Sequence, residues 1–144
     1  MLRSLLAIIL AVIVGMVAAK FVEGAGQMFF PAPGVDFADP ASLRAGAGTI
    51  PFGYKAMLVA GWALGAFFAA ALALLITRRW APVGWLAAAS MTLLAIISLA
   101  AAPFGALVWL CALIGTSAGG WAAVKLLRAG YAYPEAGQVK RPFP

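Results

Sequence analysis

The feature that most constrains this chain is a long stretch without a single charged residue. Between Arg79 and Lys125 the sequence contains no Asp, Glu, Lys, Arg or His. Two further apolar stretches, at about 5–22 and 56–77, precede it. Of the 144 residues, 65% are hydrophobic and only 10% are charged, and a chain of this size cannot bury so much apolar surface within itself in water. The sequence therefore predicts an integral membrane protein.

Four segments are long and apolar enough to cross a bilayer as helices. A hydrocarbon core of about 30 Å needs about 20 helical residues. Pro103 and Gly105 allow a tight connection between the last two segments, and Pro82 suits the first turn of the third. The sequence predicts an all-α fold, an integral membrane four-helix bundle, with spans at about 5–22, 56–77, 83–102 and 105–127.

The polar segment at 24–54 is predicted to be an ordered outer loop between the first two spans. The pair Asp39-Pro40 is typical of a helix N-terminus, so we expect a short helix at 40–45. The loop is too apolar for a flexible tether, and we expect it to fold back over the bundle or to lie among the lipid headgroups. Residues 1–128 would then form one four-span membrane domain, followed by a cytoplasmic tail at 129–144.

The distribution of basic residues predicts how the chain is oriented. With the N-terminus inside, most basic residues lie on the cytoplasmic side, whereas those on the outer side are balanced by acidic residues. We therefore expect both termini in the cytoplasm. The cytoplasmic residues would be Arg3, Arg78, Arg79, Lys125, Arg128, Lys140 and Arg141, and the outer ones Lys20, Arg44 and Lys55 against Glu23, Asp36 and Asp39.

The first span has an alternative interpretation as a cleaved secretory signal. Arg3 and a short apolar run lead to the small residues Val17-Ala18-Ala19, which resemble a cleavage site. After Glu23, however, the chain continues into a loop and further spans instead of a soluble domain, and this favours an uncleaved span.

Small residues four apart form stripes on the first, second and fourth spans. Each stripe lies on one face of a helix, and helices in lipid associate where small residues let their backbones approach. Whether these faces meet within the chain or meet a partner stays open. The second and fourth spans also align without gaps, as an internal repeat or generic membrane composition would produce. The candidate packing residues are Gly15, Gly61, Gly65, Gly115 and Gly119.

Glu23 and Lys20 are the candidate functional residues. Glu23 continues the small-residue stripe of the first span, since it follows Gly15 and Ala19 at intervals of four. A carboxylate at the membrane is a functional hypothesis by default. The alternative is that Glu23 sits at the outer boundary and pairs with Lys20 or caps loop amides. Asp36, Asp39 and Arg44 form a second cluster, for which a local ion pair in the loop is expected.

Several kinds of chemistry are excluded by what the sequence lacks. Histidine is absent and Cys111 is the only cysteine, so neither an internal disulfide nor a Cys/His metal or haem site can form. No nucleophile–base pair or phosphate-binding glycine loop is recognisable. The basic residues lie at span ends rather than in one nucleic-acid-binding patch. We expect no metal, no cofactor, no nucleic-acid partner and no enzymatic activity.

Part of the chain resembles a known family. The run Phe30-Pro31-Ala32-Pro33-Gly34, together with Glu23, Asp39-Pro40 and the pair Gly61/Gly65, is similar to a family of uncharacterised small bacterial four-span integral membrane proteins. The resemblance covers about the first half of the chain. It implies a multi-pass protein of the bacterial inner (cytoplasmic) membrane and carries no specific function.

The first span also resembles the first helix of small multidrug resistance transporters. The similarity runs through Ala11-Val12-Ile13-Val14-Gly15 to Glu23-Gly24. Val12, however, stands where that family has the glutamate that couples proton to drug, so the family's mechanism does not carry over.

Two functions are compatible with these features. The first is a non-catalytic structural or accessory subunit that packs against other membrane proteins or against itself within the lipid bilayer. The alternative is a transporter or channel for a small solute or lipid that uses Glu23.

Overall fold

The chain is an all-α four-helix bundle, as predicted. The computed structural model describes residues 2–101 and 104–132, which contain four long helices and one short one and no strands. The helices are α1 (Leu2–Phe29), α2 (Pro40–Gly46), α3 (Phe52–Ile76), α4 (Ala81–Ala100) and α5 (Ala106–Leu126). The predicted tail falls mostly on 133–144, outside the described residues.

The first helix is longer than its predicted span. It continues to Phe29 instead of ending near residue 22, and the first proline after it, Pro31, lies just beyond its end. Gly24 and Gly26 do not interrupt it, since glycine lowers helix stability by only about 1 kcal/mol. Glu23 therefore lies within a helix, nearly two turns before its end, and the connecting loop is shorter than the predicted 24–54.

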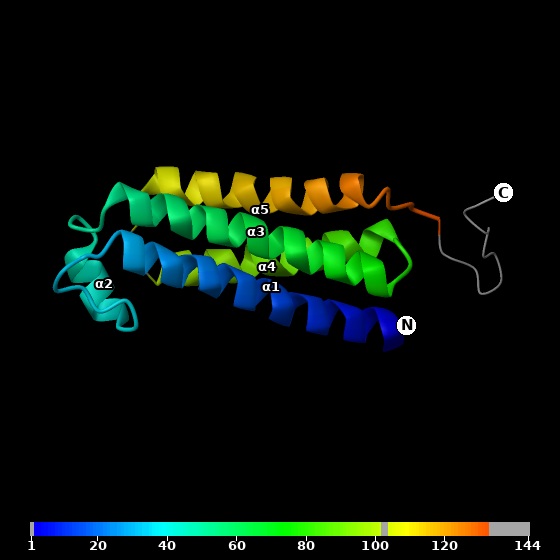
Figure 1. The fold of residues 1–144 in the computed structure, drawn as a ribbon, viewed down its shortest axis with the longest axis horizontal. Helices are drawn as coiled ribbons and strands as arrows, with labels where there is room; N and C mark the ends of the chain where they lie inside the picture. Colours follow the sequence, from blue (N-terminus) through cyan, green and yellow to red (C-terminus); the bar gives the residue numbers. More distant parts are fainter. Residues whose placement is uncertain (1, 102–103, 133–144) are drawn as a thin grey trace.

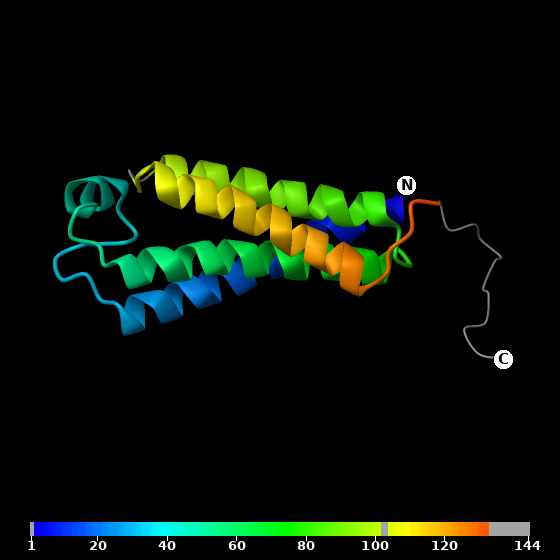
Figure 2. The ribbon, with the colours of Figure 1, turned by 90° about the horizontal axis from the view of Figure 1, so that it is seen from above.

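The four long helices alternate in direction, with α3 at the centre (Figures 1 and 2). Helix α3 contacts α1, α4 and α5, whereas α1 contacts only α3 and α4 among the described helices. The N-terminus and the end of α5 lie at the same end of the bundle, and α2 lies at the opposite end (Figure 1). The core is built largely from alanine and glycine: the buried residues of α3 include Gly61, Gly65, Ala66, Ala69, Ala70 and Ala73.

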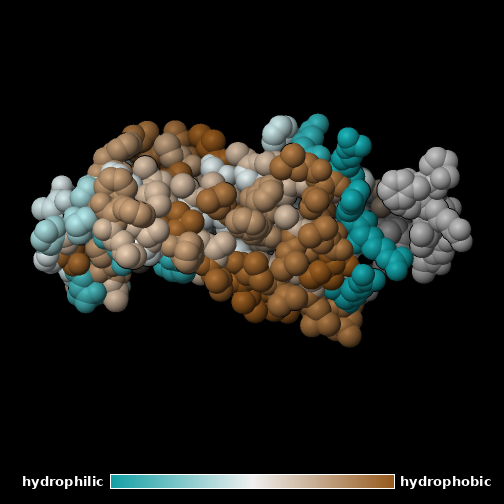
Figure 3. Space-filling model, in the orientation of Figure 1, coloured by the Kyte–Doolittle hydropathy of each residue, from teal (hydrophilic) through white to brown (hydrophobic). Residues whose placement is uncertain are grey.

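All four long helices are long and apolar enough to cross a membrane. Their outer faces carry long aliphatic side chains, among them Leu10, Ile13, Leu93 and Ile114, each at least half exposed. Hydrophobic residues cover the middle of the visible face, and hydrophilic residues gather toward its two ends (Figure 3). Such a surface belongs in lipid, and the chain is a multi-pass membrane protein.

The loop between α1 and α3 folds onto the end of the bundle. Asp39 caps α2 by accepting hydrogen bonds from the backbone N–H groups of Ala41 (3.0 Å) and Ser42 (3.1 Å). The Arg44 Nε donates to the carbonyl of Ala101 at 3.3 Å and so connects the short helix to the chain just after α4. Ala32 and Ile50 are buried with the core. The loop therefore has a defined place against the helices.

Candidate functional site

Glu23 and Lys20 form an ion pair one helical turn apart on α1. The Lys20 Nζ lies 2.6 Å from Oε2 of Glu23, and it is the only salt bridge among the described residues. The side chain of Lys20 is 56% exposed, whereas that of Glu23 is 17% exposed. Glu23 therefore turns toward the protein, and Lys20 reaches back over it from the surface. This is the pairing with Lys20 that the sequence analysis gave as the alternative to a functional role for Glu23.

A tyrosine from α3 completes the contacts of the Glu23 carboxylate. The Tyr54 hydroxyl donates to Oε1 of Glu23 at 3.2 Å. The residue is 1% exposed, and its ring packs against Phe37 of the loop with centroids 4.6 Å apart. Each oxygen of the carboxylate thus has a donor, one from its own helix and one from a neighbouring helix. Sequence reasoning did not identify Tyr54 as a partner of Glu23, since no periodicity relates it to a residue on another helix.

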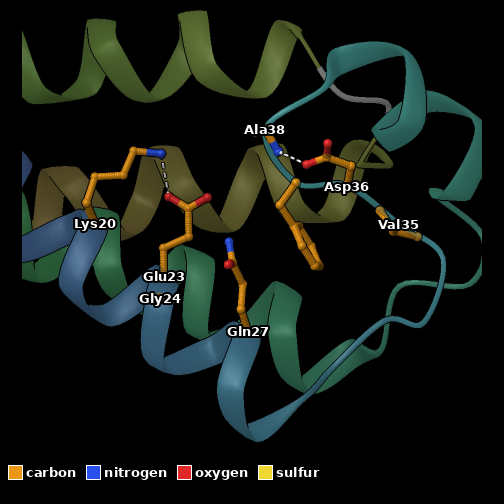
Figure 4. Close-up of a pocket in the computed structure, with 8 residues that line it drawn as sticks. Lys20, Glu23, Gly24, Gln27, Val35, Asp36 and Ala38 are labelled. Carbon is orange, nitrogen blue, oxygen red and sulfur yellow. Dashed lines mark hydrogen bonds and ion pairs between the residues drawn. The ribbon is translucent and has the colours of Figure 1, made fainter.

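The ion pair lies in the wall of an open cavity of about 500 Å³ between α1 and the loop (Figure 4). Helix α1 contributes a polar wall, and the loop contributes the opposite one. Gln27 follows Glu23 by one turn, and its amide turns toward the carboxylate (Figure 4). Its spacing of four from Glu23 was the signal that could have identified it. The lining residues are Lys20, Glu23, Gly24 and Gln27 from α1 and Val35, Asp36, Phe37 and Ala38 from the loop.

The acidic residues of the loop are engaged in local backbone contacts. The Asp36 carboxylate accepts from the N–H of Ala38 at 2.8 Å (Figure 4), and its own N–H donates to the Ser42 hydroxyl at 2.8 Å. Asp39 caps α2, and Arg44 donates to a backbone carbonyl. The loop ion pair expected from these three residues is therefore wrong within the described part of the chain. Short acidic side chains next to free N–H groups satisfy those groups first.

The side chains that line this cavity carry several hydrogen-bonding groups. It presents two carboxylates, one ammonium and one amide, so it can exchange hydrogen bonds with a small polar molecule. Both oxygens of Glu23 already accept a hydrogen bond. Among the described residues, no three His, Cys, Asp or Glu side chains gather as a metal site would require.

The glycines of α1 and α3 bring the two backbones together. A Cβ atom added to Gly65 would lie 2.7 Å from the carbonyl oxygen of Gly15, and one added to Gly15 would lie 2.6 Å from that of Gly65. A Cβ on Gly61 would lie 2.9 Å from the carbonyl oxygen of Ala19. Real Cβ atoms do not approach so closely, so these helices can pack this way only without side chains at the three positions.

Helices α3 and α5 use the other two predicted glycines in the same manner. A Cβ on Gly119 would collide with the carbonyl oxygen of Ala63, and one on Gly115 would lie 3.3 Å from the Ala63 side chain. All five candidate glycines thus face another helix of the same chain. The sequence left open whether these glycines pack within the chain or against a partner protein. In the structure all five pack within the chain.

Comparison with protein families, with curated proteins and with solved structures found no match to this chain.

Proposed function

We propose that this protein is a non-catalytic structural or accessory subunit that packs against another integral membrane protein through the outer face of α1. The observation that carries the proposal is the one-sided packing of this helix. Its buried residues are all alanine or glycine, namely Ala7, Ala11, Gly15, Ala19 and Gly26. Its other faces carry long aliphatic side chains, such as Ile13 and Val17, that are 55% and 65% exposed.

The hydroxyl side chains of α4 and α5 support this proposal because their hydrogen bonds stay within the bundle. The hydroxyls of Ser90, Thr116 and Ser117 each donate to a backbone carbonyl one turn earlier, and that of Thr92 donates to the Thr116 hydroxyl. Such bonds satisfy the hydroxyls within lipid and form no polar path across the bundle. Within the membrane-spanning part of the bundle, contact with another protein therefore falls to the apolar side chains of the lateral surface.

The test is site-specific cross-linking in native membranes. A photoreactive residue placed at Ile13, on the outer face of α1, should yield a protein adduct that mass spectrometry identifies. The matched control places the same residue at Ile97 of α4, which is 59% exposed and equally apolar. Adducts with lipid alone at both positions would contradict the proposal, because they would show that α1 faces only the bilayer.

The cavity beside Glu23 favours a second candidate function, the binding or transport of a small solute or lipid. Glu23 is mostly shielded, yet it borders an open cavity of about 500 Å³ with three other polar side chains. Glu23→Gln should then abolish solute binding or flux while preserving the bundle, since glutamine still accepts from Tyr54. Asp39→Asn is the control, because it keeps the cap of α2 and lies outside the cavity. Unchanged binding and flux in Glu23→Gln would remove this candidate.

A further inference from the structure

The end of the bundle opposite the loop gathers basic residues from three helices. Arg3 lies in the first turn of α1, Arg78 and Arg79 follow α3, and Lys125 and Arg128 lie at the end of α5. In Figure 3 hydrophilic residues form a strip at this end, directly beside the hydrophobic surface. We call Arg3, Arg78, Arg79 and Arg128 the arginine cluster.

Hydrogen bonds to backbone carbonyls hold together the segments that carry these arginines. The Arg3 guanidinium donates to the carbonyl of Ile76 at 2.7 Å, two residues before Arg78. The N–H of Gly130, two residues after Arg128, donates to the carbonyl of Arg79 at 2.9 Å. The carbonyl of Gly130 in turn accepts from the N–H of Ala81 at 2.8 Å. Segments far apart in the sequence are thereby tied into one surface.

Three of these arginines occupy a backbone conformation that usually belongs to glycine. The φ angles of Arg78, Arg79 and Arg128 are 57°, 65° and 49°. Helices commonly end with a glycine in this region because a Cβ atom is disfavoured there. Glycine at these positions would thus adopt the same backbone conformation at a lower energetic cost. The guanidinium groups are not required to end the helices.

The positive charge of this end is not balanced within the described residues. The three acidic residues that the structure describes, Glu23, Asp36 and Asp39, all lie toward the loop end, together with Lys20, Arg44 and Lys55. Arg78, Arg79 and Arg128 are exposed, and their guanidinium groups form no salt bridge within the described part of the chain. Like charges held this close favour an anionic ligand.

Aromatic residues place the cluster at the level of the lipid headgroups. The indole Nε1 of Trp85 donates to the Tyr131 hydroxyl at 3.2 Å, close to the ends of α3 and α5. Tryptophan and tyrosine gather at the interface because their rings are apolar and their donors are polar. The phosphates of lipids lie in the same layer.

We propose that the arginine cluster binds the phosphate group of an anionic phospholipid. Guanidinium groups bind phosphate oxygens through paired hydrogen bonds, and a lipid supplies a phosphate at the depth where these arginines lie. The cluster takes its guanidinium groups from α1, α3 and α5, so one lipid headgroup would link three helices. The inference does not depend on the proposed contact of α1 with another protein.

The experiment uses the purified full-length chain in non-ionic detergent, titrated with phosphatidylglycerol or phosphatidylcholine. Native mass spectrometry counts the bound lipids and yields their affinity. Phosphatidylglycerol should bind more tightly, and Arg79→Gln/Arg128→Gln should weaken its binding about 25-fold, since each basic residue contributes about fivefold. The matched control, Arg44→Gln/Lys55→Gln, removes the same charge at the other end and should keep the affinity.

Further arms separate charge, fold and ligand. Arg79→Lys/Arg128→Lys keeps the charge and should retain most of the phosphatidylglycerol affinity, and unchanged phosphatidylcholine binding in all variants shows that the bundle is intact. Equal affinity for the two lipids, or equal losses in the two charge-removing variants, would overturn the proposal. So would inorganic phosphate that binds as tightly as phosphatidylglycerol, because the site would then recognise a free phosphate.

Discussion

At the scale of single residues, the absence of a side chain matters most in this protein. Gly15 and Gly65 each approach the carbonyl oxygen of the other so closely that no Cβ atom fits. In lipid the hydrophobic effect does not hold helices together, so their contact rests on van der Waals packing at short range. A methyl group added at this contact would therefore push the two helices apart and weaken their packing.

Gly65→Ala should destabilise the bundle although alanine is the better helix former. Its Cβ would lie 2.7 Å from the carbonyl oxygen of Gly15 and 2.9 Å from Cε of Met91, and only the methionine can move aside easily. We expect a loss of about 1–3 kcal/mol in the free energy of unfolding, as for other overpacked cores. Reversible unfolding in detergent measures it.

Gly24→Ala is the control for this prediction. It lies in the last two turns of α1, and its added Cβ would meet nothing within 4 Å. It should leave stability unchanged or raise it by up to about 1 kcal/mol. Equal effects of the two substitutions would mean that the close approach of α1 and α3 does not stabilise the protein.

At the scale of helices, α3 and α5 end in the same way. The N–H of Arg79 donates to the carbonyl of Leu74, and the N–H of Ala129 donates to that of Val124, with Arg78 and Arg128 in left-handed conformation at matching places. These residues lie in the two segments that align in the sequence. The ends of α3 and α5 are therefore similar in backbone geometry as well as in sequence. Similar spacing of residues in the two segments explains this, and no repeat of whole hairpins is needed.

Helices α4 and α5 are joined by a hydroxyl pair, whose removal gives a second prediction. The Thr92 hydroxyl donates to that of Thr116 at 3.1 Å, and Thr116 is fully buried. Thr116→Val keeps the shape and removes the bond, so the free energy of unfolding should fall by about 0.6 kcal/mol and by no more than about 1.7 kcal/mol. Denaturant titration in mixed micelles measures it.

Ser117→Ala is the matched control for the hydroxyl pair. The Ser117 hydroxyl donates to the carbonyl of Leu113 in its own helix and is exposed. It should change stability by less than the valine substitution. If both variants behaved alike, the bond between α4 and α5 would have no separate role in stability.

At the scale of the whole molecule, the two ends of the bundle differ in charge. One end carries the loop with its acidic and basic residues in near balance, and the other carries the arginine cluster. The start of α1 and the end of α5 both lie at the second end, because an even number of long helices returns the chain to its starting side. The charge difference favours that end on the cytoplasmic side of the membrane.

This orientation predicts which positions a membrane-impermeant thiol reagent can reach in intact cells. In a Cys111→Ala background, Ser42→Cys in α2 should be labelled from outside, and Ala132→Cys should be labelled only after the membrane is opened. The opposite pattern would reverse the orientation. Labelling of both positions in intact cells would contradict the alternating path of the four helices through a membrane.

The properties that could be predicted from the sequence are those that depend on neighbouring residues. Hydropathy over about 20 residues reveals a membrane span, and Asp39-Pro40 reveals the start of α2, because the forces concerned act within one segment. The small-residue stripes were visible for the same reason. The extension of α1 to Phe29 was not, since its boundary lies where hydropathy fades but no residue breaks the helix.

Contacts between segments became evident only from the arrangement of the helices in space. Tyr54 meets Glu23 across 31 positions of sequence, and Gly130 meets Arg79 across the length of two helices. Hydrophobic periodicity states which face of a helix is apolar or small, but it does not state which helix will lie against that face. The pairing of the glycines, the cavity beside Glu23 and the arginine cluster all depend on that choice, which is made by packing of the whole bundle.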